Sequence, residues 1–209
     1  MEPSDIAEIE RRVFPRRTGS GVVSRRARNA AGLILLLLSA AVPASDSDNP
    51  GSEFSAIFKF SGGKQGSRQM GATIVVHRYT PVEEARQLGE ILKSQGQASF
   101  ANALRGRANG LLRIGALEHN LDLISTKATS KGFKLLAITN RPIKYEENAQ
   151  GASSLDYPFA VILLEIDGFG RGEGRFFPSS ALRVQPDGAL DVYQYAEGEG
   201  RVTDVKKVR

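Results

Sequence analysis

The sequence contains no cysteine. This absence excludes disulfide bonds, thiolate zinc sites, iron–sulfur clusters, cysteine nucleophiles and the acylated cysteine of a lipid anchor. Histidine is scarce as well, because the chain has two, His77 and His119. A metal site without thiolates needs several histidines and carboxylates at close spacing. The sequence therefore predicts neither a metal site nor a cofactor, and folding must depend on packing and hydrogen bonds.

Charge is nearly balanced over most of the chain. The 209 residues carry 28 basic and 23 acidic side chains, a formal net charge of +5. Residues 1–44 hold 7 of the basic and 4 of the acidic side chains, which leaves 21 and 19 in the remainder, a net charge of +2. Because nucleic-acid-binding domains usually carry a strongly basic surface, we expect no nucleic acid among the partners.

The segment that ends at Ala44 has the three parts of a secretory signal. A basic stretch at 24–28 precedes the apolar run 30–42, and small residues lead into the polar stretch 45–51. Export signals share this order of basic head, apolar core and small residues. We therefore expect residues 1–44 to be a signal peptide that is cleaved after Ala44, and the protein to be exported to the periplasm or the extracellular space.

Two alternatives to this reading of the N-terminus stay open. An uncleaved segment 30–44 would tether the protein to a membrane, although a spanning helix needs about 20 apolar residues and this run is shorter. The head also carries acidic residues, which are unusual in a basic head, and translation from Val22 or Val23 would remove them. Membrane contact is expected only through 30–44, if that segment is not cleaved.

The first half of the remaining chain combines strand and helix signals. Aromatic and β-branched residues at 53–60 and 72–79 predict two strands that pair as a hairpin. Thr80, Pro81 and Glu83 then form the pattern of a helix-capping box. The sequence therefore changes from strand to helix at this point.

Two short helices are expected after this cap. Apolar residues recur at spacings of three and four up to Ser94, Gly96 interrupts the pattern, and residues 98–105 resume it. The sequence therefore predicts a short helix pair inserted after the first two strands.

From Gly110 onward the apolar residues alternate with a period close to two, which predicts strands. We expect them at 111–117, 121–127, 134–139, 159–166, 173–177, 182–184, 190–195 and 201–208. Glycine-bearing turns at 130–132 and 186–188 favour hairpins. The predicted fold class is α+β, an antiparallel β-sheet with a short helix pair, in a single domain over 53–209 that follows a polar spacer at 45–52.

Glycine occupies every second position of segment 167–174. A dinucleotide-binding loop needs a different glycine spacing and a following helix. We instead expect a turn that leads into a strand, with a bare face that admits another backbone or a large aromatic ring. Arg171 and Arg175 share the opposite face and are candidate ligand contacts.

Two further segments, 140–146 and 156–159, each place a proline beside a strand with aromatic and charged neighbours. We expect both to lie at the same end of the sheet. Because binding residues concentrate on loops, Arg141, Tyr145 and Tyr157 are the candidate contacts there.

Catalytic motifs are weak. Segment 151–155 lacks the final glycine of a nucleophile elbow. His77 is expected in a strand and His119 in a turn at 118–120. A Ser-His-Asp enzyme that uses either histidine stays an open alternative, as does a carboxylate-based hydrolase acting on an envelope polymer or small substrate.

Several segments of the C-terminal half resemble a known group of sequences. They are Asn140-Arg141-Pro142-Ile143, Asp156-Tyr157-Pro158-Phe159, Gly172-Glu173-Gly174 and Asp187-Gly188-Ala189-Leu190, together with the valine-rich basic end. Over roughly residues 110–209 the chain thereby resembles uncharacterised exported bacterial proteins, for which no activity, ligand or catalytic residue is assigned. The resemblance implies a strand-rich C-terminal half and a place in the bacterial envelope.

The sequence as a whole therefore predicts an exported envelope protein with a non-catalytic role. No convergent set of nucleophile, base and oxyanion donors is readable from it. We expect a binding or structural module whose partner, an envelope protein or a ligand, the sequence does not identify.

Overall fold

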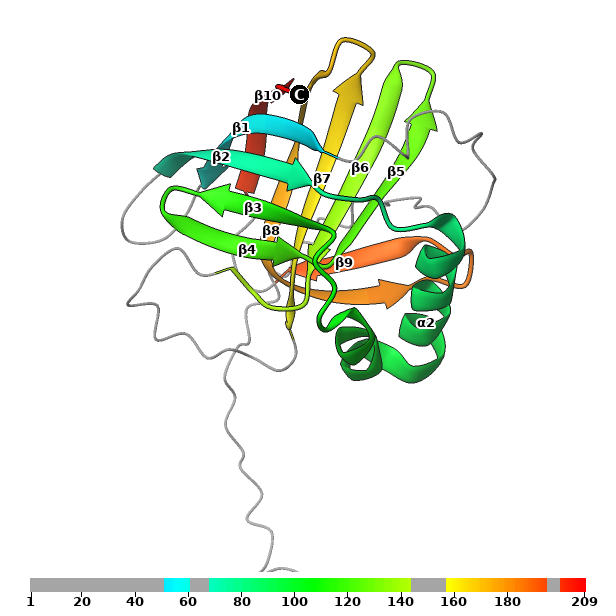
Figure 1. The fold of residues 1–209 in the computed structure, drawn as a ribbon. Coiled ribbons are helices and arrows are strands. Elements are labelled where there is room, and N and C mark those ends of the chain that lie inside the picture. Colours follow the sequence, from blue (N-terminus) through cyan, green and yellow to red (C-terminus); the bar gives the residue numbers. More distant parts are fainter. Residues whose placement is uncertain (1–50, 61–67, 144–156, 195–199) are drawn as a thin grey trace, which may run out of the picture. The chain divides into compact units, whose positions relative to one another are not determined.

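The computed structural model describes residues 51–60, 68–143, 157–194 and 200–209, all of which belong to one compact unit of the chain. The expected signal peptide, its cleavage point Ala44 and Tyr145 lie outside the described residues. Strands make up 59% of the described residues and form one ten-stranded sheet, accompanied by one described helix (Figure 1).

The first strand begins at Ser52, the last residue of the expected spacer. The strands are β1 (Ser52–Phe60), β2 (Arg68–Val76), β3 (Gly110–Ile114), β4 (Leu117–Leu121), β5 (Leu123–Thr129), β6 (Gly132–Thr139), β7 (Phe159–Asp167), β8 (Arg171–Val184), β9 (Leu190–Gln194) and β10 (Gly200–Lys207). The helix α2 (Val82–Leu104) lies between β2 and β3.

The expected α+β fold with a short helix pair is wrong. In the described part of the chain a single helix, α2, follows β2, and the other regular elements are antiparallel strands. Gly96, with φ 81° and ψ −175°, is not helical and kinks α2, and helical residues resume after it up to Leu104. A glycine with positive φ usually ends a helix, which is why its position predicted two helices. Here Leu92 and Phe100, on either side of the kink, are buried in the same apolar layer.

Thr80 does not cap the helix, because α2 has no side-chain cap hydrogen bond. The Thr80 hydroxyl is buried and accepts hydrogen bonds from Asn109 Nδ2 at 2.8 Å and from the Ile124 amide at 3.1 Å. Glu83 instead pairs with Arg86 on the surface. The capping-box pattern assigned the Thr80 hydroxyl to the helix. In the structure this hydroxyl instead binds residues distant in the sequence, including Ile124 at the start of β5.

The order of strands in the sheet follows the chain closely. It is β4-β3-β2-β1-β10-β8-β7-β6-β5, and β9 pairs with β8 outside this path. The first and last strands meet, because β1 pairs with β10. The two ends of the path, β4 and β5, are joined by Asp122 alone. The sheet is therefore nearly closed on itself, with its opening between β4 and β5.

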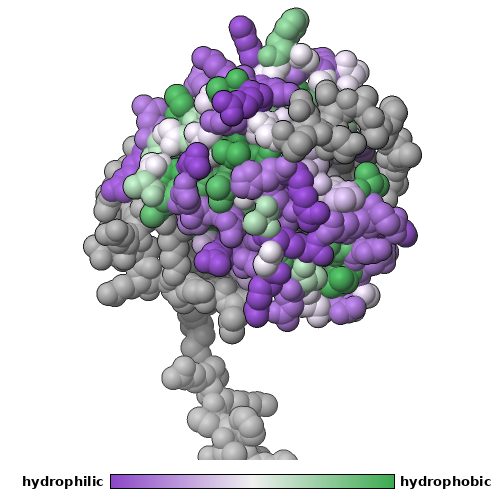
Figure 2. Space-filling model, viewed as in Figure 1, coloured by the Kyte–Doolittle hydropathy of each residue, from purple (hydrophilic) through white to green (hydrophobic). Residues whose placement is uncertain are grey.

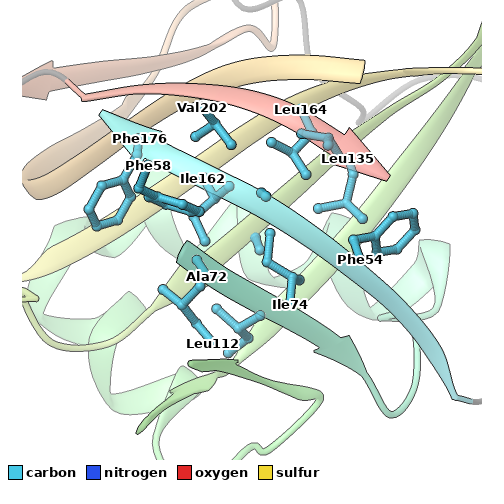
Figure 3. Packing of buried hydrophobic residues seen from close by; sticks show 14 of the residues in the cluster. Phe54, Phe58, Ala72, Ile74, Leu112, Leu135, Ile162, Leu164, Phe176 and Val202 are labelled. Carbon is cyan, nitrogen blue, oxygen red and sulfur yellow. The ribbon is translucent and has the colours of Figure 1, made fainter. Parts of the chain in front are cut away.

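Large apolar side chains fill the space inside this folded sheet (Figure 3). The labelled ones are Phe54, Phe58, Ala72, Ile74, Leu112, Leu135, Ile162, Leu164, Phe176 and Val202. The rings of Phe58 and Phe176 meet edge to face with centroids 5.0 Å apart. These residues come from β1, β2, β3, β6, β7, β8 and β10, so one apolar core packs strands from both halves of the sheet against each other.

The other face of the sheet carries a second apolar layer beneath α2. Leu88, Leu92 and Phe100 of the helix pack in one cluster with Val161 of β7 and Phe177 of β8. Strand β7 is buried on both faces, as the uninterrupted apolar run at 160–164 indicates for a central strand. On the side of the molecule seen in Figure 2, hydrophilic residues predominate, with smaller apolar areas between them.

Candidate functional site

A cleft of about 750 Å³ lies at the end of the sheet where the β5–β6 and β7–β8 hairpins turn. We call it the hairpin-end cleft. It is lined by Thr129, Ser130, Lys131, Phe133, Lys134, Glu165, Ile166, Asp167, Arg171, Gly172, Glu173, Thr203, Asp204, Val205 and Lys206. Arg171 is a residue that the sequence predicted as a ligand contact. The two hairpins and β10 therefore supply a site with both charges and an apolar component.

The glycine-rich segment forms the turn that positions Arg171. One carboxylate oxygen of Asp167 accepts hydrogen bonds from the amides of Phe169 at 2.8 Å and Arg171 at 2.9 Å. Gly170 takes φ 75°, which favours glycine. Within β8, a Cβ at Gly174 would overlap the carbonyl oxygen of a β7 residue. The prediction of a turn leading into a strand whose bare face admits another backbone is confirmed.

The carboxylates of the cleft all accept hydrogen bonds from the protein itself. Glu165 pairs with Lys134 at 2.6 Å, and Glu173 pairs with Arg201 at 2.7 Å. Asp204 accepts a hydrogen bond from the neighbouring threonine hydroxyl at 3.0 Å. The fourth carboxylate binds the turn amides described above. These acidic groups therefore have protein partners already.

Two cations of the cleft face each other without such partners. Arg171 of β8 and Lys206 of β10 occupy directly opposite positions on adjacent strands, and both are exposed. No carboxylate among the described residues lies within 4.0 Å of either side-chain cation. Like charges directly opposite each other destabilise an antiparallel pair. An anion bound between these side chains would remove that repulsion.

In the other like-charged pairs of the described sheet, which include Lys59 opposite Arg201 and Lys127 opposite Lys134, at least one member pairs with a group of opposite charge. Glu165 lies opposite Glu173, but each carboxylate has its own cation. Arg175 lies opposite Arg201, which pairs with Glu173. The Arg175 guanidinium lies over the Phe177 ring, 5.5 Å from its centroid. Arg175, a predicted contact, therefore packs against the apolar layer and does not line the cleft.

The described parts of the two proline-bearing segments, 140–143 and 157–159, lie at the same end of the sheet, as predicted. The amide of Ile143 donates to the carbonyl of Pro178 at 2.8 Å, and the hydroxyl of Ser179 donates to the carbonyl of Tyr157 at 3.2 Å. Both segments are thus tied to adjacent residues of β8. This location is separate from the hairpin-end cleft, whose lining includes neither Arg141 nor Tyr157.

Arg141 belongs to a second group of ionisable residues, at the opening between β4 and β5. Asp122, which joins these strands, is 4% exposed and accepts a hydrogen bond from the Asn140 amide at 2.8 Å. Burial raises the pKa of Asp122 to about 6, although the Asn140 amide and the Arg141 charge act in the opposite direction. Asp122 therefore combines a structural role at the end of β6 with an unusual titration.

His119 lies in β4 and not in the expected turn, opposite Leu112 of β3. Its Nε2 atom is buried and has no hydrogen-bond partner among the described residues. Burial lowers the pKa of His119, and the positive charge of Arg141 lowers it further. The side chain is therefore held neutral near pH 7, facing the core side of the sheet edge.

We expect Asp122→Asn to raise the free energy of unfolding at pH 7 by about 2 kcal/mol. The folded-state pKa of Asp122, about 6, lies above its ordinary value of 3.8. A raised carboxyl pKa gives stability that is complete below pH 4 and is lost as the pH rises through 6. Asparagine keeps an acceptor for the Asn140 amide but does not ionise. Urea unfolding of both proteins between pH 4 and 7.5 measures the difference.

The two proteins should differ much less at pH 4 than at pH 7, since the folded-state carboxyl is then protonated and the unfolded-state carboxyl is close to its ordinary pKa of 3.8. Glu90→Gln, which neutralises an exposed carboxylate of α2 with no ion pair among the described residues, serves as the control and should change stability by less than about 0.5 kcal/mol across this range. A constant difference between Asp122→Asn and wild type across this range would contradict the assignment.

Sequence reasoning missed the most informative residue of the cleft, Lys206. It appeared only as part of a basic end of the chain, because nothing local indicates that β10 pairs with both β1 and β8. The role of Asp122 was missed too, since it follows from the one-residue connection between two strands that do not pair. Strand β4 was missed because the three consecutive polar residues at 118–120 interrupt the alternation of apolar and polar residues that predicts a strand.

Comparison with known proteins adds no assignment. No protein-family model, curated protein or solved structure matches this chain. Among the described residues, no helix has the length and apolarity needed to cross a membrane. Within the same residues, no three or more histidine or acidic side chains are grouped so as to hold a metal ion. The features that bear on function are therefore the hairpin-end cleft and the group of ionisable residues around Asp122.

Proposed function

We propose that the protein is an exported envelope protein whose described domain is a non-catalytic module that binds an anionic partner at the hairpin-end cleft. Export is supported by the signal-like sequence of residues 1–44 and by the resemblance of residues 110–209 to exported bacterial proteins. Binding is supported by the cleft. The observation that carries the proposal is the uncompensated opposition of Arg171 and Lys206.

The arrangement of charges favours an anionic partner over a cationic one. The acidic groups of the cleft already accept hydrogen bonds from amides, a hydroxyl or their own cations. Arg171 and Lys206 have no described carboxylate partner, and Lys131 of the adjacent turn has none either. An anion would therefore gain charge-assisted hydrogen bonds without displacing an existing pair.

We expect Lys206→Glu to weaken binding of a soluble anion, poly-glutamate peptide, by roughly tenfold. The new carboxylate would lie opposite Arg171 and form an ion pair with its guanidinium, which would then be less available to the anion. Wild-type affinity should also fall as salt rises, because exposed charges are screened. Isothermal titration calorimetry at low and physiological salt measures both effects.

Lys93→Glu is the matched control, since Lys93 is exposed on α2 and does not line the cleft. It makes the same change in net charge and should leave the affinity within about twofold of wild type. Equal affinity of wild type and Lys206→Glu would reject the cleft as the binding site.

A carboxylate-based hydrolase is the second candidate, because Asp122 has a raised pKa beside Arg141. A carboxyl that is partly protonated near pH 6 can act as a general acid. Asp122 is also almost fully buried, and its carboxylate accepts a structural hydrogen bond. Hydrolysis of purified envelope polymer by wild type but not by the stably folded Asp122→Asn variant would favour this function over simple binding.

A further inference from the structure

We infer that the hairpin end of the domain docks on an anionic lipid bilayer, with the ring of Phe169 inserted below the charged headgroups. By the hairpin end we mean Ser130–Lys131, Gly168–Arg171 and Lys206–Arg209. Figure 1 shows these two turns and the end of β10 at the same end of the sheet, at the top of the view. The inference depends on the proposed function and names the partner of the same site.

Phe169 is 90% exposed at the tip of the β7–β8 turn. The turn is fixed by the Asp167 carboxylate, which accepts the amides of Phe169 and Arg171, and by the Gly170 amide, which donates to the Asp167 carbonyl at 3.0 Å. A rigid turn therefore presents a large apolar ring to solvent. Figure 2 shows an apolar projection beside hydrophilic residues at this end of the molecule.

Backbone hydrogen bonds place a basic residue on each side of this turn. The Gly168 amide donates to the carbonyl of Lys131 at 3.0 Å, which ties the β5–β6 turn to one side. The Lys207 amide donates to the carbonyl of Gly170 at 2.7 Å, which ties the end of β10 to the other. Phe169 thus lies on the β7–β8 turn, which backbone hydrogen bonds join to the β5–β6 turn on one side and to the end of β10 on the other.

Five basic residues lie on the three segments at this end of the sheet. Lys131, Arg171, Lys206, Lys207 and Arg209 all belong to the hairpin end. Within the described ranges, none of these five has a carboxylate partner within 4.0 Å. Beside them Val208 is a second large apolar residue, 62% exposed. An apolar tip with a basic surround is the chemistry that binds the interface of an anionic bilayer.

This geometry fits a bilayer better than an acidic protein. A protein partner would need an apolar pocket for Phe169 surrounded by acidic groups at matching positions. A bilayer offers apolar chains beneath an anionic surface wherever the ring enters, so a projecting tip needs no matching shape. Aromatic rings and long basic side chains both favour this interface.

The test uses the absence of tryptophan from the sequence. Phe169→Trp in the full chain gives a single fluorescent reporter at an exposed position, where the fold should accept it. Vesicles of phosphatidylglycerol and phosphatidylcholine should shift its emission to shorter wavelength, and bromine on the acyl chains should quench it. Vesicles of phosphatidylcholine alone should cause a much smaller shift.

Val82→Trp is the control reporter, because Val82 is 64% exposed at the start of α2. That position lies near Thr80, which is bonded to the start of β5, whereas the hairpin turn follows the end of β5. Binding through any other part of the chain, including residues 30–44, would leave the reporter at position 169 unchanged or would change both reporters. The inference expects the anionic vesicles to shift the emission of the first reporter alone.

An unchanged emission at position 169 with anionic vesicles would overturn the inference, as would equal shifts in the two variants. The poly-glutamate titration separates this failure from failure of the proposed function. If poly-glutamate binds in a Lys206-dependent manner while vesicles have no effect at position 169, the partner is not a bilayer but the anion-binding cleft stands. If neither binds, both proposals fall.

Discussion

Replacing Gly174 by alanine is expected to lower the free energy of unfolding by about 3 kcal/mol, near the upper end of the usual cost of overpacking. Gly174 lies on the core side of β8, opposite Leu164 of β7 and Val202 of β10. A Cβ at this position would overlap the carbonyl oxygen of Leu163 and come within 2.8 Å of a Leu164 methyl carbon. Since the first of these atoms is backbone, the two central strands would have to separate. Denaturant unfolding measures the loss.

Gly71→Ala is the matched control for this substitution. Gly71 also lies in a strand, β2, but no other atom comes within 4 Å of a Cβ built there. Its replacement should change stability by less than about 0.5 kcal/mol. Similar losses in the two variants would mean that the close approach of β7 and β8 is not what requires Gly174.

Replacing Phe176 by alanine should lower the free energy of unfolding by about 3–5 kcal/mol. Phe176 is fully buried, and its ring meets the rings of Phe58 at 5.0 Å and Phe60 at 5.8 Å between centroids. These partners belong to β1, on the other side of β10 in the sheet. The loss combines transfer of the ring to water with the cavity left among its neighbours. Urea unfolding gives the difference in free energy.

Phe169→Ala makes the same chemical change at a ring that is 90% exposed. It should alter stability by no more than about 0.5 kcal/mol. This comparison separates an aromatic residue needed by the core from one that the fold does not need. A large stability loss for Phe169→Ala would indicate a structural role for the ring and weaken the argument that it serves contact with a partner.

Local sequence patterns predicted strands correctly where neighbouring residues alone indicate a buried strand or a tight turn. The apolar run at 160–164 predicted the central strand β7, which is covered on both faces. The turn at 186–188 predicted the β8–β9 hairpin, in which Asp187 accepts the Ala189 amide and Gly188 takes φ 83°. In such cases a few neighbouring residues determine the geometry.

Features that depend on distant partners were not predictable. The sheet closes through pairing of β1 with β10, whose residues are far apart in the sequence. The opposition of Arg171 and Lys206 requires the register of β8 against β10, including a bulge between Val202 and Val205. The helix kink at Gly96 had the local signal of a helix end, and only packing of both halves against the same layer distinguishes the two.

The most direct test of the account is the stability of Lys206→Glu with and without poly-glutamate. Without the anion, the variant should be more stable than wild type by about 0.5–1 kcal/mol, because an opposite-charge pair replaces two facing cations. With saturating anion, wild type should gain stability through binding and the variant should gain far less. A variant that is less stable than wild type, or equally stabilised by the anion, would contradict an anion site between Arg171 and Lys206.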